Sequence, residues 1–580
     1  MKTSRIALAG ALTIGLAAAA AGCGSGGTST ANNTPTTKPV SGGTIVYALP
    51  PATNINWYFP LATSGNNSLY NAQLTTQLYK PLIWINSKYT INYQSSIAQK
   101  ITSNKSGTVY HVFMNPKWKW SDGTPVTSAD VLWTWQIIQA TSASNAPAPW
   151  PFVGAGSGDV PTGIQSVVAN SKYEFTVTLK KPANQEWFIY NGLSDFQPLP
   201  VQDTLWNKYP NNITQEVKYL GQQATNPKFD NIVDGPYKLA SATANQSWTL
   251  VPNPTYPGHK AYDKIILTYE GSNASEFAAL KTGAVQVGYV DLSEYGARKE
   301  LTSDNLFPSY GFDYNYLALN LNSKAQNGLG PVFQQLYVRQ AMEMALNQQA
   351  VDTAIFHGYA PPQYGPIPTT PATAYLDPRL KKPLYPYSPS KAKKLLESHG
   401  WSMQNGVMTK NGLKLAFTII YSSGNTSLDE QLALFQQNFA AIGIKVNLKP
   451  EPFATMLGII ANPADEGQWD AAGGIGIIYG GSYPTGQSLF GTGGGNNFAG
   501  YSSKKEDQLI AATHAPQPST AANLQTYFNY EYYTAQQVPG YLWTNQVGTI
   551  NAVATNVHNV QQYSNGLTGY PQFQYWWAAK

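Results

Sequence analysis

Hydrophobic residues along this chain follow both periodicities of regular secondary structure. Alternating or short apolar runs predict strands at 43–49, 109–114, 177–179 and 444–448. Hydrophobic residues at helical spacing predict a helix over 338–346. Because strands and helices alternate along the chain, the pattern favours an α/β fold. No short-period repeat is visible, so we do not expect a solenoid or a propeller.

Capping signals locate the N-termini of three more helices. Thr127 with Asp130, and Ser427 with Glu430, have the spacing of a capping box, in which each side chain bonds the backbone N–H of the other residue. Ser388 is followed by a proline, which suits the first turn of a helix. The expected apolar faces are Val131, Leu132, Trp135 and Ile138 on the first helix, and Leu432, Phe435, Phe439 and Ile442 on the helix at Ser427.

Length and composition limit the class of protein. The chain has 580 residues, whereas single hydrophobic cores stop growing near about 250–300 residues, so we expect two or more lobes. Charged residues make up only 12% and the net charge is +5, while the chain has 38 Tyr and 15 Trp. Abundant aromatic residues exclude global disorder, and the weak, scattered positive charge excludes a nucleic-acid-binding protein. Few carboxylates would also limit the change of charge in an acidic habitat, which is a second explanation of this composition.

The N-terminus is typical of an exported protein. Residues 1–22 have a cationic start and an apolar run that is too short for the usual membrane span of about 20 residues, so we interpret them as a signal peptide. The run ends at Cys23, the only cysteine. This ending resembles the lipobox of bacterial lipoproteins, which implies cleavage before Cys23 and lipidation of its sulfur. Residues 23–41 are then the lipidated cysteine and a flexible tether.

Motifs of the common enzyme and metal-binding classes are missing from the sequence. The six histidines are too far apart for an HExxH or zinc-finger pattern, and a lone cysteine cannot build a zinc site. There is no GxSxG nucleophile elbow and no GxxxxGK phosphate loop. We therefore expect no metal, no cofactor and no catalytic residues, although a triad assembled from distant residues would escape such a search.

Seven short blocks, in order, resemble a known protein family. The segment 118–131 contains Asp-Gly-Thr-Pro followed by Thr-Ser-Ala-Asp-Val, and Gly-Pro-Tyr-Lys-Leu stands at 235–239. The other blocks are 42–47, 253–256, 280–283, 317–320 with 338–341, and 388–401. Together they make the chain similar to the family 5 extracellular solute-binding proteins of ABC importers, which bind peptides, oligopeptides or nickel.

The resemblance implies a two-lobed, periplasmic-binding-protein-like α/β fold with the ligand enclosed between the lobes. Lobe one would comprise residues 42–309 plus 546–580 and include an extra subdomain, and lobe two would comprise 310–545. The chain would cross between them near 314–320 and return near 541–549.

Loops at strand ends supply the pocket in this family, and they define our candidate ligand-binding residues. Uncharged hydrogen-bonding or stacking side chains gather in the loops after the first strand and in the segment 478–484. For the loops after the first strand, an ordinary surface loop is an equally good interpretation. The candidates are Asn54, Asn56, Trp57, Ser64, Asn66, Asn425, Tyr479, Ser482, Tyr483 and Trp543.

One departure from the family pattern concerns the charge of the ligand. Peptide-binding relatives carry an aspartate in the segment that corresponds to 478–484, where it pairs with the α-ammonium of the peptide. This chain has no acid between Asp470 and Glu506. A buried ammonium without a partner costs several kcal/mol, so a neutral or hydroxyl-rich ligand gains weight.

These observations lead to one functional hypothesis with two alternatives. The chain is expected to be a lipid-anchored, extracytoplasmic receptor that captures a small solute, a peptide by resemblance, and passes it to the permease and ATPase of an ABC importer. An oligosaccharide or another neutral solute is the alternative ligand. A secreted polymer hydrolase and a surface adhesion or signalling protein are alternative classes.

Overall fold

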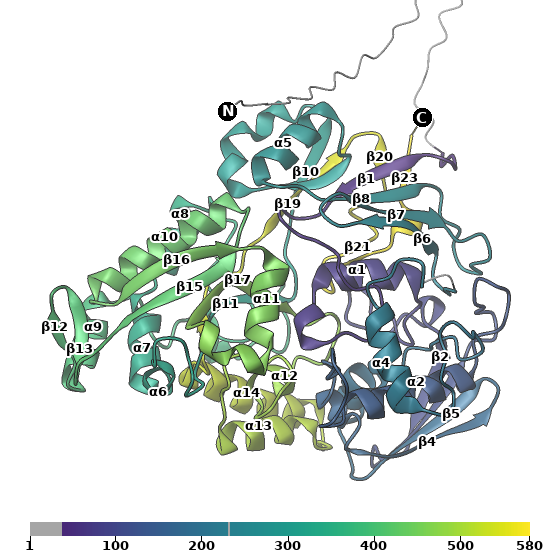
Figure 1. Cartoon of the computed structure of the whole chain (residues 1–580), viewed down its shortest axis with the longest axis horizontal. Helices are drawn as coiled ribbons and strands as arrows, with labels where there is room; N and C mark the ends of the chain where they lie inside the picture. The colour runs from purple at the N-terminus through teal and green to yellow at the C-terminus, as the bar shows by residue number, and fades with distance from the viewer. Residues whose placement is uncertain (1–37, 230–231, 580) are drawn as a thin grey trace, which may run out of the picture.

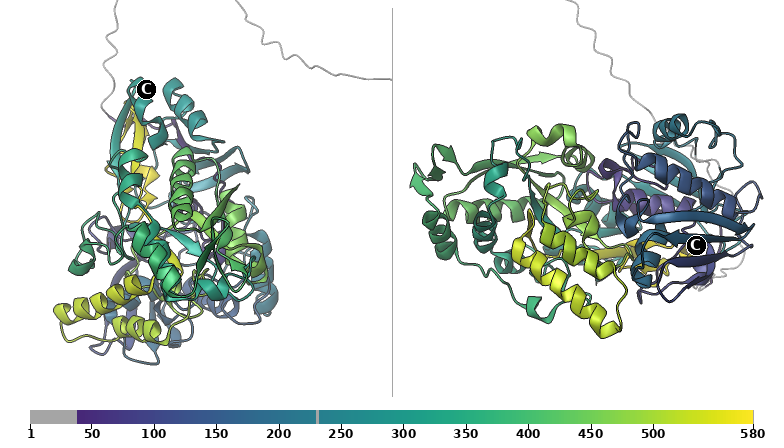
Figure 2. Two further views of the ribbon diagram at one scale, coloured as in Figure 1. Left: turned by 90° about the vertical axis from the view of Figure 1, so that its left-hand side faces the viewer. Right: turned by 90° about the horizontal axis from the view of Figure 1, so that it is seen from below.

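The computed structural model describes residues 38–229 and 232–579 of this chain. The predicted signal peptide, Cys23 and most of the predicted tether therefore lie outside the described residues. Figures 1 and 2 show two parts side by side, each built around its own sheet. We call the part with the larger sheet lobe one and the other part lobe two. Within the described ranges, no helix combines the length and the apolar character needed to cross a bilayer.

Lobe one contains a seven-stranded sheet assembled from distant parts of the chain. Its order is β10 (Asp304–Ser309), β19 (Thr549–Ala554), β9 (Val287–Val290), β1 (Thr44–Ala48), β8 (Lys264–Thr268), β7 (Ser247–Pro252) and β6 (Tyr237–Thr243). The first predicted strand is confirmed as β1, which lies parallel to β8 and β9 in the middle of the sheet. The carboxyl ends of these parallel strands consequently meet at one edge.

Lobe two contains a five-stranded sheet flanked by helices. Its order is β16 (Lys445–Glu451), β15 (Ala416–Ser422), β17 (Ala471–Ile478), β11 (Asp313–Leu319) and β18 (Tyr541–Trp543). The main helices of this lobe are α7 (Leu336–Ala345), α9 (Pro389–Ser398), α10 (Thr426–Ala441), α11 (Phe453–Ala461), α13 (Lys504–His514) and α14 (Thr520–Gln537). The mixture of helices with parallel and antiparallel strands confirms the predicted α/β class.

Two short segments join the sheets. The chain leaves the seven-stranded sheet after Ser309 and enters the five-stranded sheet at Asp313, and it returns between Trp543 and Thr549. The Gln546 side chain ties the two segments together: its Nε2 donates to the Gly311 carbonyl, at 2.9 Å, and to Asp313 Oδ1, at 3.0 Å. A rotation of one lobe against the other would therefore bend a pair of linked segments.

A smaller four-stranded sheet lies in the chain between β1 and β6. Its order is β2 (Ala98–Ser103), β3 (Val109–Met114), β5 (Glu174–Leu179) and β4 (Ile164–Ser171), and the helices α2 (Ser128–Thr141) and α4 (Ile213–Gln223) pack beside it (Figure 1). β3 spans the predicted residues 109–114, and β5 contains the predicted strand at 177–179. This sheet occupies the lobe-one side of the molecule, away from α10.

Of the two predicted capping boxes, one is present and the other is not. The capping box of Thr127 and Asp130 is present at the start of α2, whereas the one predicted for Ser427 and Glu430 is wrong. Asn425 caps α10 instead, because its side chain accepts the N–H of Leu428 at 2.8 Å. Ser427 is thereby placed inside the first turn.

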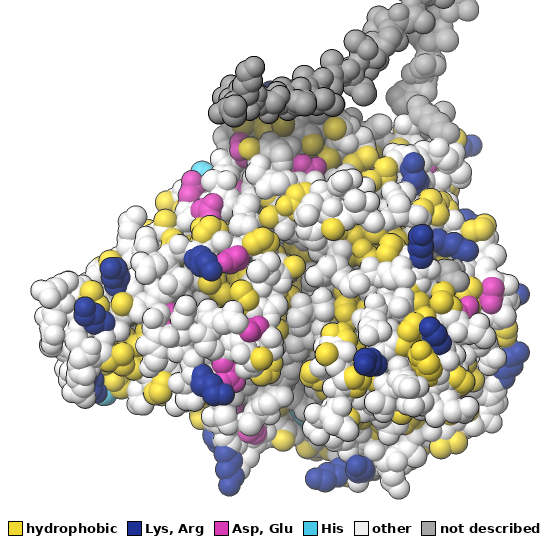
Figure 3. All heavy atoms as spheres, in the orientation of Figure 1, with side chains coloured by type: hydrophobic (Ala, Val, Ile, Leu, Met, Phe, Trp, Pro, Cys, Tyr) yellow, Lys and Arg dark blue, Asp and Glu magenta, His cyan; other side chains and the backbone are white. Residues whose placement is uncertain are grey.

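The predicted apolar faces are buried to different degrees. On α10, Leu432, Phe435 and Phe439 are buried, as is Ile442, the C-cap of the helix. On α2, Leu132 and Trp135 are only half-buried, and Trp133 and Ile137 take part in the core instead. Lys, Arg, Asp and Glu are scattered thinly over the face seen in Figure 3, in agreement with the low charge of the sequence.

Candidate ligand-binding site

A cavity of about 520 Å³ lies between the lobes, where the two sheets face each other. Lobe one supplies the ends of β1 and β9 and the helix α1 (Leu69–Leu78), and lobe two supplies β11, β17 and the first half of α10. The two joining segments line it through Gly311, Thr544, Val547 and Gly548. This volume falls in the range of about 300–1,000 Å³ typical of small-molecule sites. The position at the carboxyl ends of parallel strands is the usual place for a ligand in an α/β sheet.

The cavity wall is mainly apolar, aromatic and amide in character. Its apolar side chains include Leu69, Val287, Phe307, Phe356, Leu428, Leu432, Phe435, Ile475 and Ile478. Its uncharged polar side chains include Tyr70, Tyr289, Asn315, Asn425, Gln431, Thr544, Asn551 and Gln561. Such a wall can enclose a ligand with apolar contacts and orient it with a few hydrogen bonds.

The charged groups in the wall are all acidic. Asp291 and Asp313 line the cavity, and no Lys, Arg or His among the described residues does so. Burial raises the pKa of Asp313 to about 6, against the hydrogen bond from Gln546, which favours the ionised form. The cavity is therefore suited to neutral or cationic groups, and it offers no charged partner for an anion.

Tyrosine hydroxyls stay protonated in this environment. Burial raises the pKa of Tyr70 to about 12 and that of Tyr289 well above its ordinary value, and the nearby carboxylate of Glu276 acts in the same direction. Both hydroxyls therefore serve as neutral hydrogen-bonding groups at physiological pH.

The lobes touch each other around the cavity. The Ser427 hydroxyl in α10 donates to Asp291 Oδ1 at 2.6 Å and accepts the N–H of Ser293 at 2.9 Å. Elsewhere the Ser64 hydroxyl donates to the Gly495 carbonyl at 2.8 Å. These bonds join residues of lobe one to residues of lobe two, so the structure represents a closed arrangement of the lobes.

Among the ten predicted residues, Asn425 lines this cavity. Its place follows from its role as the N-cap of α10, which brings it to the end of the helix that faces lobe one. The other nine residues do not line the cavity.

The five candidates from the first loops bind neighbouring protein groups. Ser64 takes part in the contact between the lobes, and Trp57 is buried in the core with 3% of its surface exposed. The partners of the five are Asn245 for Asn54, Asn71 for Asn56, the Leu61 carbonyl for Trp57, the Gly495 carbonyl for Ser64 and the Thr63 hydroxyl for Asn66.

The four remaining candidates contact other parts of the protein. The Tyr479 hydroxyl donates to the Pro366 carbonyl, Tyr483 pairs with Asn523, and Trp543 is 1% exposed. Ser482 lines a separate space of about 70 Å³ beside Tyr190. The segment 478–484 therefore meets the cavity through Ile478, the residue before Tyr479.

Several wall residues were not among the candidates. Asp291 directly follows β9, so its position after an apolar strand was a usable signal. Asp313 begins β11, and Tyr289 lies inside β9, where nothing in the local sequence separates them from ordinary strand residues.

Nothing in the described residues forms a group of three or more His, Cys, Asp or Glu able to hold a metal ion. Amides, hydroxyls and apolar side chains make up the rest of the cavity wall around its two acids. The arrangement can therefore enclose and orient a molecule through hydrogen bonds and apolar contact.

Comparison with known proteins identifies the family. Residues 92–498 match the model of the bacterial extracellular solute-binding proteins, family 5. The chain belongs to this family. As a family 5 member it is an extracellular solute-binding protein.

Individual relatives agree with the family 5 assignment. The chain is 26% identical over 461 residues to a dipeptide-binding protein of Lactococcus lactis, covering 75% of this chain and 78% of the relative. The structure of the oligopeptide-binding protein AppA from Bacillus subtilis, in complex with a nonapeptide, matches with a TM-score of 0.79 and 21% identity over 94% of this chain and 100% of that one.

A third similar structure carries a different ligand. NikZ from Campylobacter jejuni, in complex with Ni(L-His), matches with a TM-score of 0.71 and 19% identity over 93% of this chain and 99% of that one. The predicted two-lobed fold is confirmed by these matches. Because similar folds hold a nonapeptide and a nickel complex, the fold does not determine the ligand.

Proposed function

We propose that this family 5 protein is the lipid-anchored, extracytoplasmic receptor of an ABC importer, and that it captures a small solute by closing its two lobes around it. The observation that carries the proposal is the cavity of about 520 Å³, which both lobes and both joining segments line. A solute enclosed there contacts both lobes, so its binding energy favours the closed arrangement over an open one.

The proposed lobes follow the sheets. Lobe one comprises residues 42–309 plus 546–580, and lobe two comprises 310–545. The changes of sheet after Ser309 and after Trp543 support these boundaries. Closure would then be a hinge rotation in residues 310–312 and 544–548, where Gln546 links the two segments.

A peptide is the proposed ligand. Relatives named as dipeptide-binding and oligopeptide-binding proteins support this class. The cavity wall is rich in apolar and amide side chains and has few charged ones, which suits a short peptide bound by apolar contacts and hydrogen bonds. An oligosaccharide is the second candidate, because tyrosine hydroxyls and amides in the wall offer uncharged hydrogen-bonding groups to sugar hydroxyls.

The proposed cellular setting combines the predicted anchor with the family. Lipidation of Cys23 would hold the protein at the outer face of the cell membrane, with the permease and ATPase subunits of the importer as its partners. Similar proteins that are named as ABC transporter peptide-binding proteins support these partners. The protein would have no catalytic activity and would release its solute chemically unchanged.

A thermal-shift screen of the purified protein tests the proposal. Mixtures of short peptides, oligosaccharides and nickel chelates are titrated separately, since a ligand of the native state stabilises it by RT ln(1 + [L]/Kd). We expect peptides to raise the Tm with concentration. A shift with oligosaccharides alone would select the second candidate, and cleavage of any added polymer would support a hydrolase instead.

A further inference from the structure

A contact between the lobes, away from the cavity, encloses a histidine. His514 is the last residue of α13 in lobe two, and its ring stacks on that of Trp187 in lobe one, with ring centres 3.9 Å apart and planes inclined by 11°. Trp187 ends the short helix α3 (Gln185–Trp187), which follows β5 along the chain. His514 is 8% exposed and Trp187 is 1% exposed, so the contact between the lobes covers both residues.

Asn184 holds this contact together by bonding to both lobes. Its Oδ1 accepts the N–H groups of Glu186 and Trp187, at 3.1 and 3.4 Å, as the N-cap of α3. Its own N–H donates to the His514 carbonyl at 2.7 Å, and its Nδ2 donates to the Thr513 carbonyl at 3.2 Å. Lobe one therefore supplies donors to the last carbonyls of α13, which have no partner within their own helix.

The imidazole of His514 is held in its neutral form. Its Nε2 lies 2.9 Å from the Thr485 hydroxyl in lobe two. Burial alone lowers the pKa of His514 to about 3, from an ordinary value of about 6.5. An imidazolium enclosed here would lose its water without gaining a counter-ion, which makes the charged form costly.

Charged groups on the elements around His514 do not pair with it. In α13, Asp507 accepts the N–H and the hydroxyl of Thr492, and Glu506 accepts the Thr534 hydroxyl. No carboxylate of the described residues forms an ion pair with His514. The other titratable groups of these elements are Asp159, Lys180, Lys181 and Glu186 in lobe one, and Tyr483, Lys504, Lys505, Tyr527, Tyr530, Glu531, Tyr532 and Tyr533 in lobe two.

Separation of the lobes would expose this histidine to water. Trp187 and Asn184 would move away with lobe one, and one face of the His514 ring would become accessible, so its pKa would return toward the ordinary value. The open state then binds a proton more tightly than the closed state does. By linkage, protons favour opening, and this effect grows as the pH falls below about 6.5.

We propose that His514 couples the closure of the lobes to pH, so that the receptor holds its ligand firmly near neutral pH and opens and releases it more readily in acid. This inference rests on the proposed function, because it concerns the closure that encloses the solute. With a proton affinity of the open state near the ordinary value for histidine, the ligand affinity falls by about 10-fold between pH 7.5 and pH 5.5.

Binding titrations of the purified full chain at pH 7.5 and pH 5.5 test this inference. The probe is an equimolar mixture of synthetic di- to hexapeptides of Ala, Leu, Phe and Tyr. The test variant is His514→Gln, which keeps a hydrogen-bonding side chain for Thr485 and cannot be protonated. The control is His357→Gln, because His357 also stacks on a residue of lobe one, Tyr295, with ring centres 4.7 Å apart, but is exposed. Asp313 and the peptides titrate alike with all three proteins, so the comparison removes their contribution.

We expect the wild type and His357→Gln to lose about 10-fold more affinity than His514→Gln between pH 7.5 and pH 5.5. Calorimetry in buffers of different ionisation enthalpy should show that, at pH 5.5, the wild type releases about 0.9 proton more than His514→Gln on binding, because His514 gives up its proton when the lobes close. Equal pH dependence and equal proton release in the wild type and His514→Gln overturn this inference and leave the proposed function standing.

Small-angle scattering without ligand distinguishes a failure of this inference from a failure of the proposed function. The radius of gyration of the wild type should be larger at pH 5.5 than at pH 7.5, and that of His514→Gln should not increase. If no peptide binds at either pH, the proposed peptide ligand is wrong, and a wild-type radius that does not change with pH then overturns this inference too. The wild-type radius decides in the same way if His514→Gln does not fold.

Discussion

The hydroxyl of Ser427 in lobe two donates a hydrogen bond to the carboxylate of Asp291 in lobe one, with an oxygen–oxygen distance of 2.6 Å. The same hydroxyl accepts the N–H of Ser293 at 2.9 Å. Ser427 is 1% exposed, so both bonds are shielded from water in the closed arrangement. They break when the lobes separate, and they therefore stabilise the closed state relative to the open one.

Ser427→Ala should weaken ligand binding without unfolding either lobe. The variant loses a charge-assisted bond worth about 1.5–3 kcal/mol in the closed state only, so we expect roughly 10- to 100-fold weaker binding of a peptide that binds the wild type. Small-angle scattering without ligand should show a larger radius of gyration, because the open state becomes more populated.

Thr426→Ala is the matched control for this prediction. Thr426 lies in the same first turn of α10 and is exposed, so its loss changes the helix without touching lobe one. Equal affinity and equal radius of gyration in the two variants would show that the bond between Ser427 and Asp291 does not contribute to closure.

Asn425 should have two separable roles. Its Oδ1 caps α10 by accepting the N–H of Leu428, and the residue also lines the cavity. Asn425→Ser keeps a good capping residue but removes the amide, whereas Asn425→Ala removes both. We expect only the alanine variant to lose about 1 kcal/mol of unfolding free energy in urea titrations, while both variants bind a peptide ligand more weakly. Unchanged binding by Asn425→Ser would exclude the amide from the site.

Much of the fold could be predicted from local sequence. β3 covers the predicted residues 109–114, and the capping box of Thr127 with Asp130 is present. The error at Ser427 has a physical reason: Asn425, two residues earlier, is an equally good capping residue, and the local sequence does not determine which of the two the helix uses.

The site was less predictable because it is assembled from distant residues. The pairing of β11 with β17 brings Asp313 opposite Ile478, and the contact between the lobes brings Asp291 to Ser427. Sheet register and lobe contact create both relationships, and neither leaves a motif in the sequence. Asn425, which lines the cavity, is the N-cap of α10, whereas the sequence pattern predicted Ser427 as the cap.

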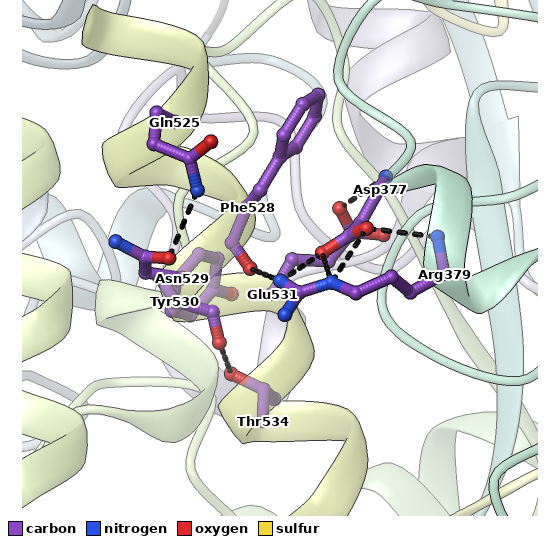
Figure 4. A network of polar contacts seen from close by, with 8 residues as sticks. All are labelled: Asp377, Arg379, Gln525, Phe528, Asn529, Tyr530, Glu531 and Thr534. Carbon is purple, nitrogen blue, oxygen red and sulfur yellow. Dashed lines mark hydrogen bonds and ion pairs between the residues drawn. The ribbon is translucent and has the colours of Figure 1, made fainter.

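Arg379 should stabilise the buried carboxylate of Asp377 in lobe two (Figure 4). Asp377 is 1% exposed, and Arg379 donates from Nε to both of its carboxylate oxygens, at 3.0 and 2.9 Å. The Asp377 N–H in turn donates to Glu531 Oε2 in α14 at 2.7 Å. Arg379→Gln would leave two neighbouring carboxyl groups without a cation, so we expect a loss of about 1–2 kcal/mol in urea-induced unfolding at pH 7.5.

Lys381→Gln provides the control, since Lys381 is exposed in the same short helical turn (Pro378–Lys381). It removes one positive charge without a bond to Asp377. If both variants unfold at the same urea concentration as the wild type, the arginine contributes nothing measurable to this cluster.

Mild acid should stabilise this protein. Burial raises the pKa of Asp234 and Glu506 to about 8 and that of Asp130 and Asp313 to about 6. Between the unfolded values near about 4 and these values, the folded state binds more protons than the unfolded state, so the unfolding free energy increases as the pH falls. Burial lowers the pKa of His514 to about 3 and also lowers that of His259, so these two groups oppose the effect below about pH 6.5, and Lys80, whose pKa burial lowers to about 7, opposes it between pH 8 and pH 7. The buried carboxyl groups outnumber them. We expect the Tm in calorimetry to be higher at pH 5 than at pH 8.

Glu506→Gln tests which groups cause this pH dependence. Glu506 is fully buried in α13, where Oε1 accepts the Thr534 hydroxyl and Oε2 has no partner among the described residues. A glutamine keeps the acceptor and cannot ionise, so the variant should be more stable than the wild type at pH 8 and equally stable at pH 5. Glu430→Gln, an exposed change of the same charge, should leave the pH profile unaltered. A Tm that falls steadily from pH 8 to pH 5 in the wild type would contradict the stabilising role of the buried carboxyl groups.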